Sequence, residues 1–152
     1  MVSGTVELTP YLSSLCTAIS YSMISDDQAI SIAVRGEGGN VDRRKAESLG
    51  LIVAELVINS LKHAFPGVAS DGLIVVAFDA GKTEWRLSVS DNGKGKQKHA
   101  GIAEGGLGTG IVAALASQLG AEVITETGPQ GTSVSVVAKR RGSFGFVGQP
   151  LE

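Results

Sequence analysis

The feature that most constrains the fold is a long helical pattern over residues 44–64, which pairs a broad apolar face with a polar stripe. The pattern stops before Pro66, because proline cannot continue a helix. At about 100° per residue, four polar side chains fall along one side of this helix. These side chains are Glu55, Asn59, Lys62 and His63. We therefore expect a helix that packs its apolar face on a core and turns the stripe toward a polar cavity.

Two interpretations of this stripe are open. The first is a solvated ladder, since polar pairs three and four residues apart stabilise helices. Asn59 argues against it, because asparagine is a poor helix former. The second is a site for a magnesium-bound phosphate chain. There Asn59 offers Mg²⁺ a hard oxygen ligand, Lys62 neutralises phosphate, and Glu55 orients or deprotonates a nucleophile.

Periodic and alternating patterns place the other elements around this helix. A first helix is predicted over residues 9–24, with Thr9 as its cap and Pro10 at its first position. A third helix is predicted over residues 108–119. Strands are predicted over residues 29–35, 73–79, 84–90, 121–126 and 132–139, with room for a short strand before the first helix. This order predicts an α+β fold, a two-layer sandwich with a mostly antiparallel mixed sheet and about three helices on one face.

Length and charge exclude several classes of protein. The 152 residues suit a single domain, which we place at residues 1–141, followed by a tail at residues 142–152 that is expected to fray. The last two residues of the tail are interpreted as a cloning scar. A net charge of −2 offers no broad basic surface for nucleic acid and no polybasic patch for a membrane.

The sequence also predicts where the chain is located and what its cysteine does. It has neither the roughly 20-residue apolar run of a spanning helix nor the pattern of a signal peptide, so we expect a cytoplasmic protein without direct membrane contact. The single cysteine, Cys16, lies in an apolar-rich run and is expected to be a small buried hydrophobe.

A glycine-rich loop after the strand at 84–90 is a candidate base-binding segment. Asp91 ends this strand, and its ionised carboxylate accepts hydrogen bonds from an exocyclic amine such as that of adenine. Gly93 and Gly95 permit close approach of the backbone to a flat ring. The alternative is a plain Asp-Asn-Gly turn.

A second glycine-rich segment, GLGTG, leads into the helix predicted at 108–119. Backbone N–H groups of Gly106, Gly108 and Gly110 gather at the helix start, where anions bind; the alternative is a simple cap. Two motif-like stretches are rejected. The GKT at 81–83 mimics the end of a P-loop but falls in a hairpin turn, and GLGTGI misses the dinucleotide fingerprint because its sixth residue is Ile111.

Taken together, these segments resemble a known family. ELVINSLKH, DNGKG, GLGTGIV and the GTS at 131–133 resemble, in order, the N, G1, G2 and G3 boxes of the Bergerat-fold GHKL ATPases. The sequence around the long helix is most similar to that of the catalytic ATP-binding domain of bacterial sensor histidine kinases of the HisKA_2 class. The related HWE class fits less well, because Trp85-Arg86-Leu87 lacks its Trp-x-Glu.

The resemblance implies a Bergerat fold that uses ATP and Mg²⁺. It makes Glu55 the catalytic carboxylate, Asn59 the Mg²⁺ ligand and Lys62 a phosphate contact. Asp91 becomes the adenine acceptor, and Thr132 supports the adenine site through its hydroxyl. The full implied nucleotide-binding set is Asn59, Lys62, His63, Asp91, Gly93, Gly95, Gly106, Leu107, Gly108, Thr109, Gly110 and Thr132.

A histidine kinase phosphorylates a histidine on a separate helical dimerisation domain, and this chain shows no such domain. Its only histidines are His63 in the N box and His99 in the lid. We expect part of a longer kinase that donates phosphate to a phosphoacceptor helical domain and, through it, to a response regulator of a two-component system. The alternatives are a stand-alone anti-sigma type serine kinase of the same fold and a nucleotide-free binding module with vestigial boxes.

Overall fold

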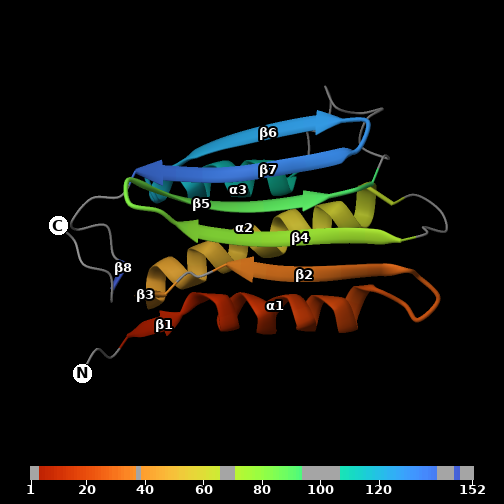
Figure 1. The fold of residues 1–152 in the computed structure, drawn as a ribbon, viewed down its shortest axis with the longest axis horizontal. Coiled ribbons are helices and arrows are strands. Elements are labelled where there is room, and N and C mark those ends of the chain that lie inside the picture. The colour runs from red at the N-terminus through yellow and green to blue at the C-terminus, as the bar shows by residue number, and fades with distance from the viewer. Residues whose placement is uncertain (1–3, 37–38, 66–70, 94–106, 140–145, 148–152) are drawn as a thin grey trace.

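The structure is a computed structural model that describes residues 4–36, 39–65, 71–93, 107–139 and 146–147. Its main sheet has five strands in the order β2-β4-β5-β7-β6 (Figure 1). The strands are β2 (Ile30–Gly36), β4 (Gly72–Ala80), β5 (Glu84–Asp91), β6 (Glu122–Gly128) and β7 (Gly131–Lys139). Neighbouring strands are antiparallel except for β2 and β4, which are parallel. The mixed, mostly antiparallel sheet is the one predicted.

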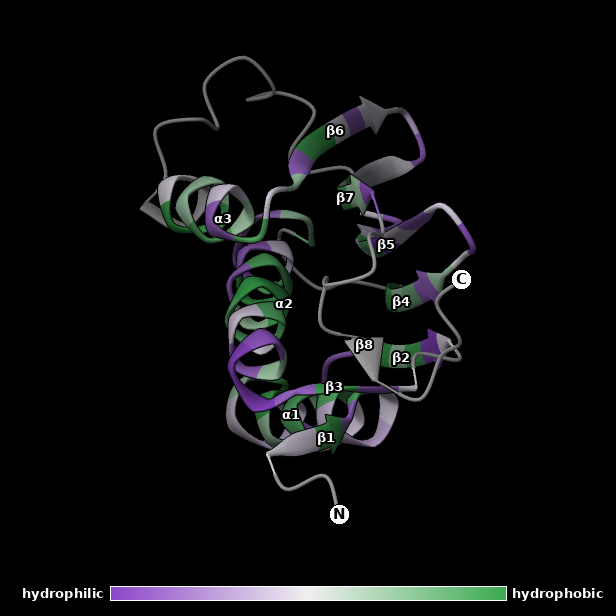
Figure 2. Cartoon of the chain, turned by 90° about the vertical axis from the view of Figure 1, so that its left-hand side faces the viewer, coloured by the Kyte–Doolittle hydropathy of each residue, from purple (hydrophilic) through white to green (hydrophobic). Residues whose placement is uncertain are grey.

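Three helices pack on this sheet: α1 (Leu8–Met23), α2 (Arg43–His63) and α3 (Leu107–Gln118). In Figure 2, α2 and α3 cover one face, while α1 lies at the β2 edge. Contacts of α1 with both α2 and β2 close the space between the layers there. This arrangement confirms the α+β two-layer sandwich. None of the described helices combines the length and apolar character needed to cross a bilayer.

A second, small antiparallel sheet was only partly anticipated. It joins β1 (Thr5–Glu7), β3 (Asn40–Asp42) and β8 (Phe146–Val147) in the order β1-β3-β8. The strand before the first helix was expected, but β3 and β8 were not, because strands of two or three residues show no alternation. The expectation of a fraying tail is wrong for Phe146–Val147, which pairs with Asn40 and Val41. The domain boundary itself stays a prediction.

The start of α1 differs from the prediction. The helix begins at Leu8, and its N-cap is Glu7, whose side chain makes no capping hydrogen bond, so Thr9 is not the cap and Pro10 is not the first helical residue. The cause is a tertiary contact. The buried Leu8 donates its backbone N–H to the carbonyl of Gly39 at 3.1 Å, which satisfies a donor that a capping side chain would otherwise serve.

The apolar face of α2 forms the centre of the core, as predicted. Asp42 caps this helix by accepting a hydrogen bond from the N–H of Lys45 at 2.9 Å. The buried α2 residues include Ile52, Val53, Leu56, Val57 and Ser60. They belong to one cluster with Phe78, Trp85 and Leu87 of the sheet, and Cys16 is buried in the same cluster. The prediction for Cys16 is therefore confirmed.

Candidate functional site

Three segments far apart in the sequence meet at one end of the sandwich. Strand β5 ends at Asp91, α2 ends at His63, and β7 begins at Gly131 (Figure 1). The strand register places Asp91 opposite Thr132. The sheet and α2 therefore bring the predicted adenine acceptor beside the end of the helix that carries the polar stripe.

The carboxylate of Asp91 is buried and held by three uncharged donors. The residue is 8% exposed. Its Oδ2 accepts a hydrogen bond from the Ser60 hydroxyl at 2.9 Å. Its Oδ1 accepts from the backbone N–H of Gly93 at 3.1 Å and of Thr132 at 3.4 Å. Burying a carboxylate is costly unless it is hydrogen-bonded, so these donors explain how Asp91 can lie at this depth.

The glycine after Asp91 has a structural reason beyond ligand approach. A Cβ built on Gly93 would overlap the carbonyl oxygen of Ala64, the residue that caps the C-terminus of α2. Only glycine therefore lets the end of β5 lie this close to the end of α2. Gly95, predicted to act in the same way, lies outside the described residues.

Asn92 fixes the same corner and was missed by the sequence analysis. Its Oδ1 accepts from the N–H of Leu73 at 2.8 Å, and its Nδ2 donates to the carbonyl of Asp71 at 3.0 Å. Asp71 has a positive φ of 60°, which is uncommon for a residue with a side chain. The amide of Asn92 thus ties the end of β5 to the start of β4. The Asp-Asn-Gly turn pattern was the only sequence signal for Asn92, and that pattern does not predict which backbone groups the side chain contacts.

The α2 stripe lies near this corner, and its side chains have no partners among the described residues. Glu55 and Asn59 are partly exposed, whereas Lys62 and His63 are exposed. Within the part of the chain that the structure describes, none of the four side chains makes a hydrogen bond or an ion pair. The structure therefore shows no ladder of contacts among these four side chains, which was the first interpretation of the stripe. These side chains keep their hydrogen-bonding capacity for water or a ligand.

The start of α3 falls where the glycine pattern placed it. The helix begins at Leu107, so Gly108, Thr109 and Gly110 form its first turn. It packs on α2. Gly106 lies outside the described residues. The GKT at 81–83 lies between β4 and β5, which confirms its rejection as a P-loop.

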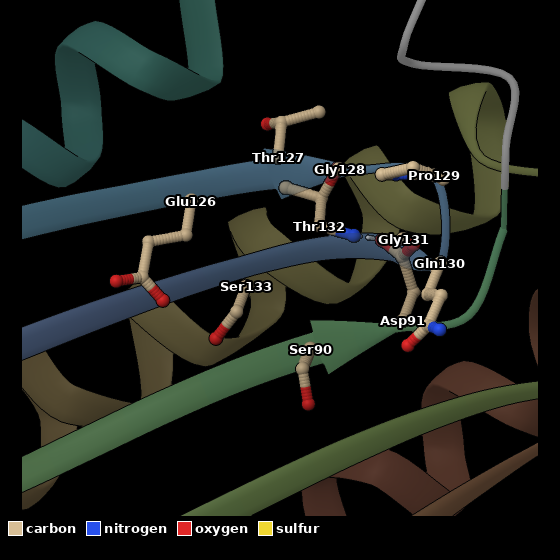
Figure 3. A pocket seen from close by; sticks show the side chains of 10 residues that line it. All are labelled: Ser90, Asp91, Glu126, Thr127, Gly128, Pro129, Gln130, Gly131, Thr132 and Ser133. Atoms are coloured by element: carbon tan, nitrogen blue, oxygen red, sulfur yellow. Dashed lines mark hydrogen bonds between the residues drawn. The ribbon is translucent and has the colours of Figure 1, made fainter.

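A cavity lies at the β6–β7 turn, and not in front of α2. Figure 3 shows it with Ser90 and Ser133 on one side of the sheet, and its volume is about 440 Å³. Asp91 and Thr132 belong to its lining, but no residue of the α2 stripe does. The turn requires glycine at position 131. Gly131 has a φ of 135°, and a Cβ there would overlap the carbonyl oxygen of Asp91.

Comparisons with known proteins identify the family and the fold of the chain. The model of the histidine kinase-like ATPase domain family matches residues 17–138. A curated relative, "Blue-light-activated histidine kinase 2" of Erythrobacter litoralis, is 32% identical over 132 residues, which make up 86% of this chain and 38% of that protein. The chain thus spans well under half of that relative.

Solved structures show the same fold. The histidine kinase domain of the Erythrobacter litoralis EL346 blue-light-activated histidine kinase superposes with a TM-score of 0.77 at 30% identity, over 91% of this chain and 64% of that one. The catalytic domain of histidine kinase ThkA gives a TM-score of 0.66 at 16% identity, over 91% and 97%. The second likeness concerns the fold alone. The resemblance to GHKL ATPases is confirmed, whereas the HisKA_2 class stays a prediction. The chain belongs to the histidine kinase-like ATPase domain family.

Proposed function

We propose that this domain binds Mg-ATP and donates the γ-phosphoryl group to a histidine on a phosphoacceptor helical domain outside this chain, in two-component signalling. The observation that carries the proposal is the juxtaposition of buried Asp91 with the polar stripe of α2, whose side chains have no partner among the residues that the structure describes. A fixed carboxylate suits the base of a nucleotide, and free carboxylate, amide and ammonium groups suit its phosphates.

Each residue of the site then has a separate role. Asp91 accepts a hydrogen bond from the adenine amine, and Gly93 and Thr132 keep its carboxylate in place. Lys62 neutralises phosphate charge, and Glu55 orients or deprotonates the attacking nucleophile. Residues 107–110 supply backbone N–H groups at the start of α3, which favour anionic groups.

The free amide of Asn59 fits a magnesium ion. Mg²⁺ prefers hard oxygen ligands and usually keeps waters and phosphate oxygens in its shell, so one amide oxygen from the protein is sufficient. When bound, the ion neutralises charge on the transferring phosphoryl group. The side chain of Asn59 makes no hydrogen bond within the described residues, and its amide oxygen is thus available for this purpose.

The phosphate acceptor is proposed to lie on another domain. In-line transfer needs a nucleophile opposite the leaving oxygen. His63 lies in the last turn of α2, next to the proposed phosphate contact Lys62, so we expect it to lie beside the phosphates and not to act as the in-line nucleophile. His99 lies outside the described residues. A HisKA_2-type helical pair, and a response regulator after it, would complete the pathway.

Radiolabelled ATP tests this proposal directly. The isolated chain should stay unlabelled, whereas addition of a matching histidine-bearing helical domain should give acid-labile, alkali-stable label on that domain. Glu55→Gln, with the same partner, serves as the inactive control. Stoichiometric label on His63 or His99 would contradict the proposal. Label on a partner serine would favour the anti-sigma type kinase instead.

A further inference from the structure

A buried serine on α2 contacts the carboxylate that we place in the base pocket. Ser60 is 3% exposed and lies on the apolar face of the helix, one residue after Asn59. Its hydroxyl donates to Oδ2 of Asp91 at 2.9 Å. Among the described residues, it is the one side-chain donor to this carboxylate, since the other two donors are backbone N–H groups.

A count of acceptor positions shows what this bond does. An ionised carboxylate has about four lone-pair sites, two on each oxygen. The N–H groups of Gly93 and Thr132 both donate to Oδ1. Ser60 occupies one site of Oδ2, which leaves one site on that oxygen for another donor. The hydroxyl therefore determines which lone pair of Asp91 remains and in which direction it points.

We infer that Ser60 is a positioning residue that sets the purine selectivity of the nucleotide site by holding Asp91 Oδ2 ready for the 6-amino group of adenine. The inference rests on the proposed ATP-binding function. A purine with a 6-oxo group would bring an acceptor against a fixed acceptor, and a purine without a 6-substituent would leave the last Oδ2 site without a donor. Both would bind more weakly than adenine.

A purely structural role for Ser60 is the competing explanation, and it predicts a different result. If the hydroxyl only stabilised the buried carboxylate, its loss would weaken all nucleotides equally by loosening the pocket. If it positions Oδ2, its loss should matter only for a base with a 6-amino group. The ratio of two affinities distinguishes these cases, because effects on folding or phosphate binding cancel in it.

The experiment uses calorimetric titration of the whole chain with Mg-ATP and with the Mg complex of purine riboside triphosphate, which carries hydrogen in place of the 6-amino group. Ser60→Ala should weaken ATP about tenfold, the size of one hydrogen bond to a charged group, while the analogue changes by less than about twofold. Ser60→Thr, which keeps the hydroxyl, should restore most of the affinity for ATP. Ser135→Ala removes another buried serine from the middle of β7 and should change neither affinity.

Ser60→Cys covers the case in which alanine does not fold, because a thiol fills similar space but donates weakly; it should give an intermediate loss of ATP affinity alone. Equal losses for ATP and the analogue, or no loss for either, in a folded variant would overturn the inference and leave the proposed function intact. A parent chain that binds neither nucleotide would instead overturn the proposed function and the inference with it.

Discussion

At the residue scale, buried and partly exposed polar groups have different roles in the proposed site. Asp91 is fixed by three hydrogen bonds, whereas Glu55 and Asn59 are unpartnered within the described residues. A fixed acceptor is suited to recognition of a base, and free side chains are suited to a metal ion and a moving phosphoryl group. The sequence predicted roles for all three residues, and these roles stay predictions. It missed Ser60, because a small residue on an apolar helix face gives no functional signal until its partner is known.

The stripe on α2 should separate nucleotide binding from chemistry. We expect Asn59→Ala to abolish the dependence of ATP affinity on Mg²⁺, because it removes the proposed metal ligand. Glu55→Gln should keep ATP affinity but reduce phosphoryl transfer about 10²- to 10⁴-fold, the range of a well-placed base. Calorimetry and the transfer assay measure the two effects. Equal loss of affinity in both variants would mean that the residues only shape the pocket.

Cys16 should be inert in the native protein. Burial raises the pKa of its thiol from 9.0 to about 11. Since the thiolate is the reactive species, alkylation near pH 9 should be much slower in the native chain than in denaturant. Between these two pKa values, the unfolded chain loses the thiol proton and the folded chain keeps it, so the stability due to Cys16 should fall as pH rises. Similar alkylation rates in native and unfolded chains would contradict this burial.

At the scale of elements, the long patterns were predictable and the short ones were not. The apolar periodicity of α2 and the alternation of β4 and β5 were sufficient to place them within one or two residues of their observed bounds. The start of α1 was not, because the carbonyl of Gly39, across the small sheet, replaces the expected side-chain cap. The pairing of β3 with β8 joins segments far apart in the chain, and such pairing leaves no local signal.

The junction of β5 and α2 should tolerate no side chain at position 93. Gly93→Ala should lower the free energy of unfolding by about 1–3 kcal/mol, because the new Cβ overlaps the carbonyl of Ala64. Gly110→Ala is the matched control. Its Cβ would meet nothing within 4 Å, and alanine in a helix should raise stability by about 0.5–1 kcal/mol. Urea titration measures both; a neutral Gly93→Ala would contradict the close packing.

At the scale of the whole molecule, one continuous core joins the helices to the main sheet. Buried residues of α1, α2, α3 and strands β2, β4, β5 and β7 belong to a single cluster. The sequence predicted this two-layer plan. It did not predict that a cavity would open at the β6–β7 turn, because the shape of that turn depends on the contact of Gly131 with the backbone of Asp91.

A single core should unfold in one step. Trp85 is the only tryptophan and is fully buried, so its fluorescence reports on the core, whereas far-ultraviolet circular dichroism reports on the helices and strands. We expect the two signals to give coincident urea transitions, as for a two-state domain. Loss of the helical signal at a clearly lower urea concentration than the Trp85 signal would show that the layers are not one cooperative unit.

The most direct measurement is a calorimetric titration of ATP into the parent chain and into Asp91→Asn, each with and without Mg²⁺. We expect the parent chain to bind ATP, more tightly with Mg²⁺ than without it and more tightly than GTP. Asp91→Asn should remain folded by circular dichroism and bind ATP about 10- to 150-fold more weakly, the value of a hydrogen bond to a charged group. Unchanged ATP affinity in folded Asp91→Asn, or equal affinity of the parent for GTP, would contradict the role of Asp91 as the adenine acceptor.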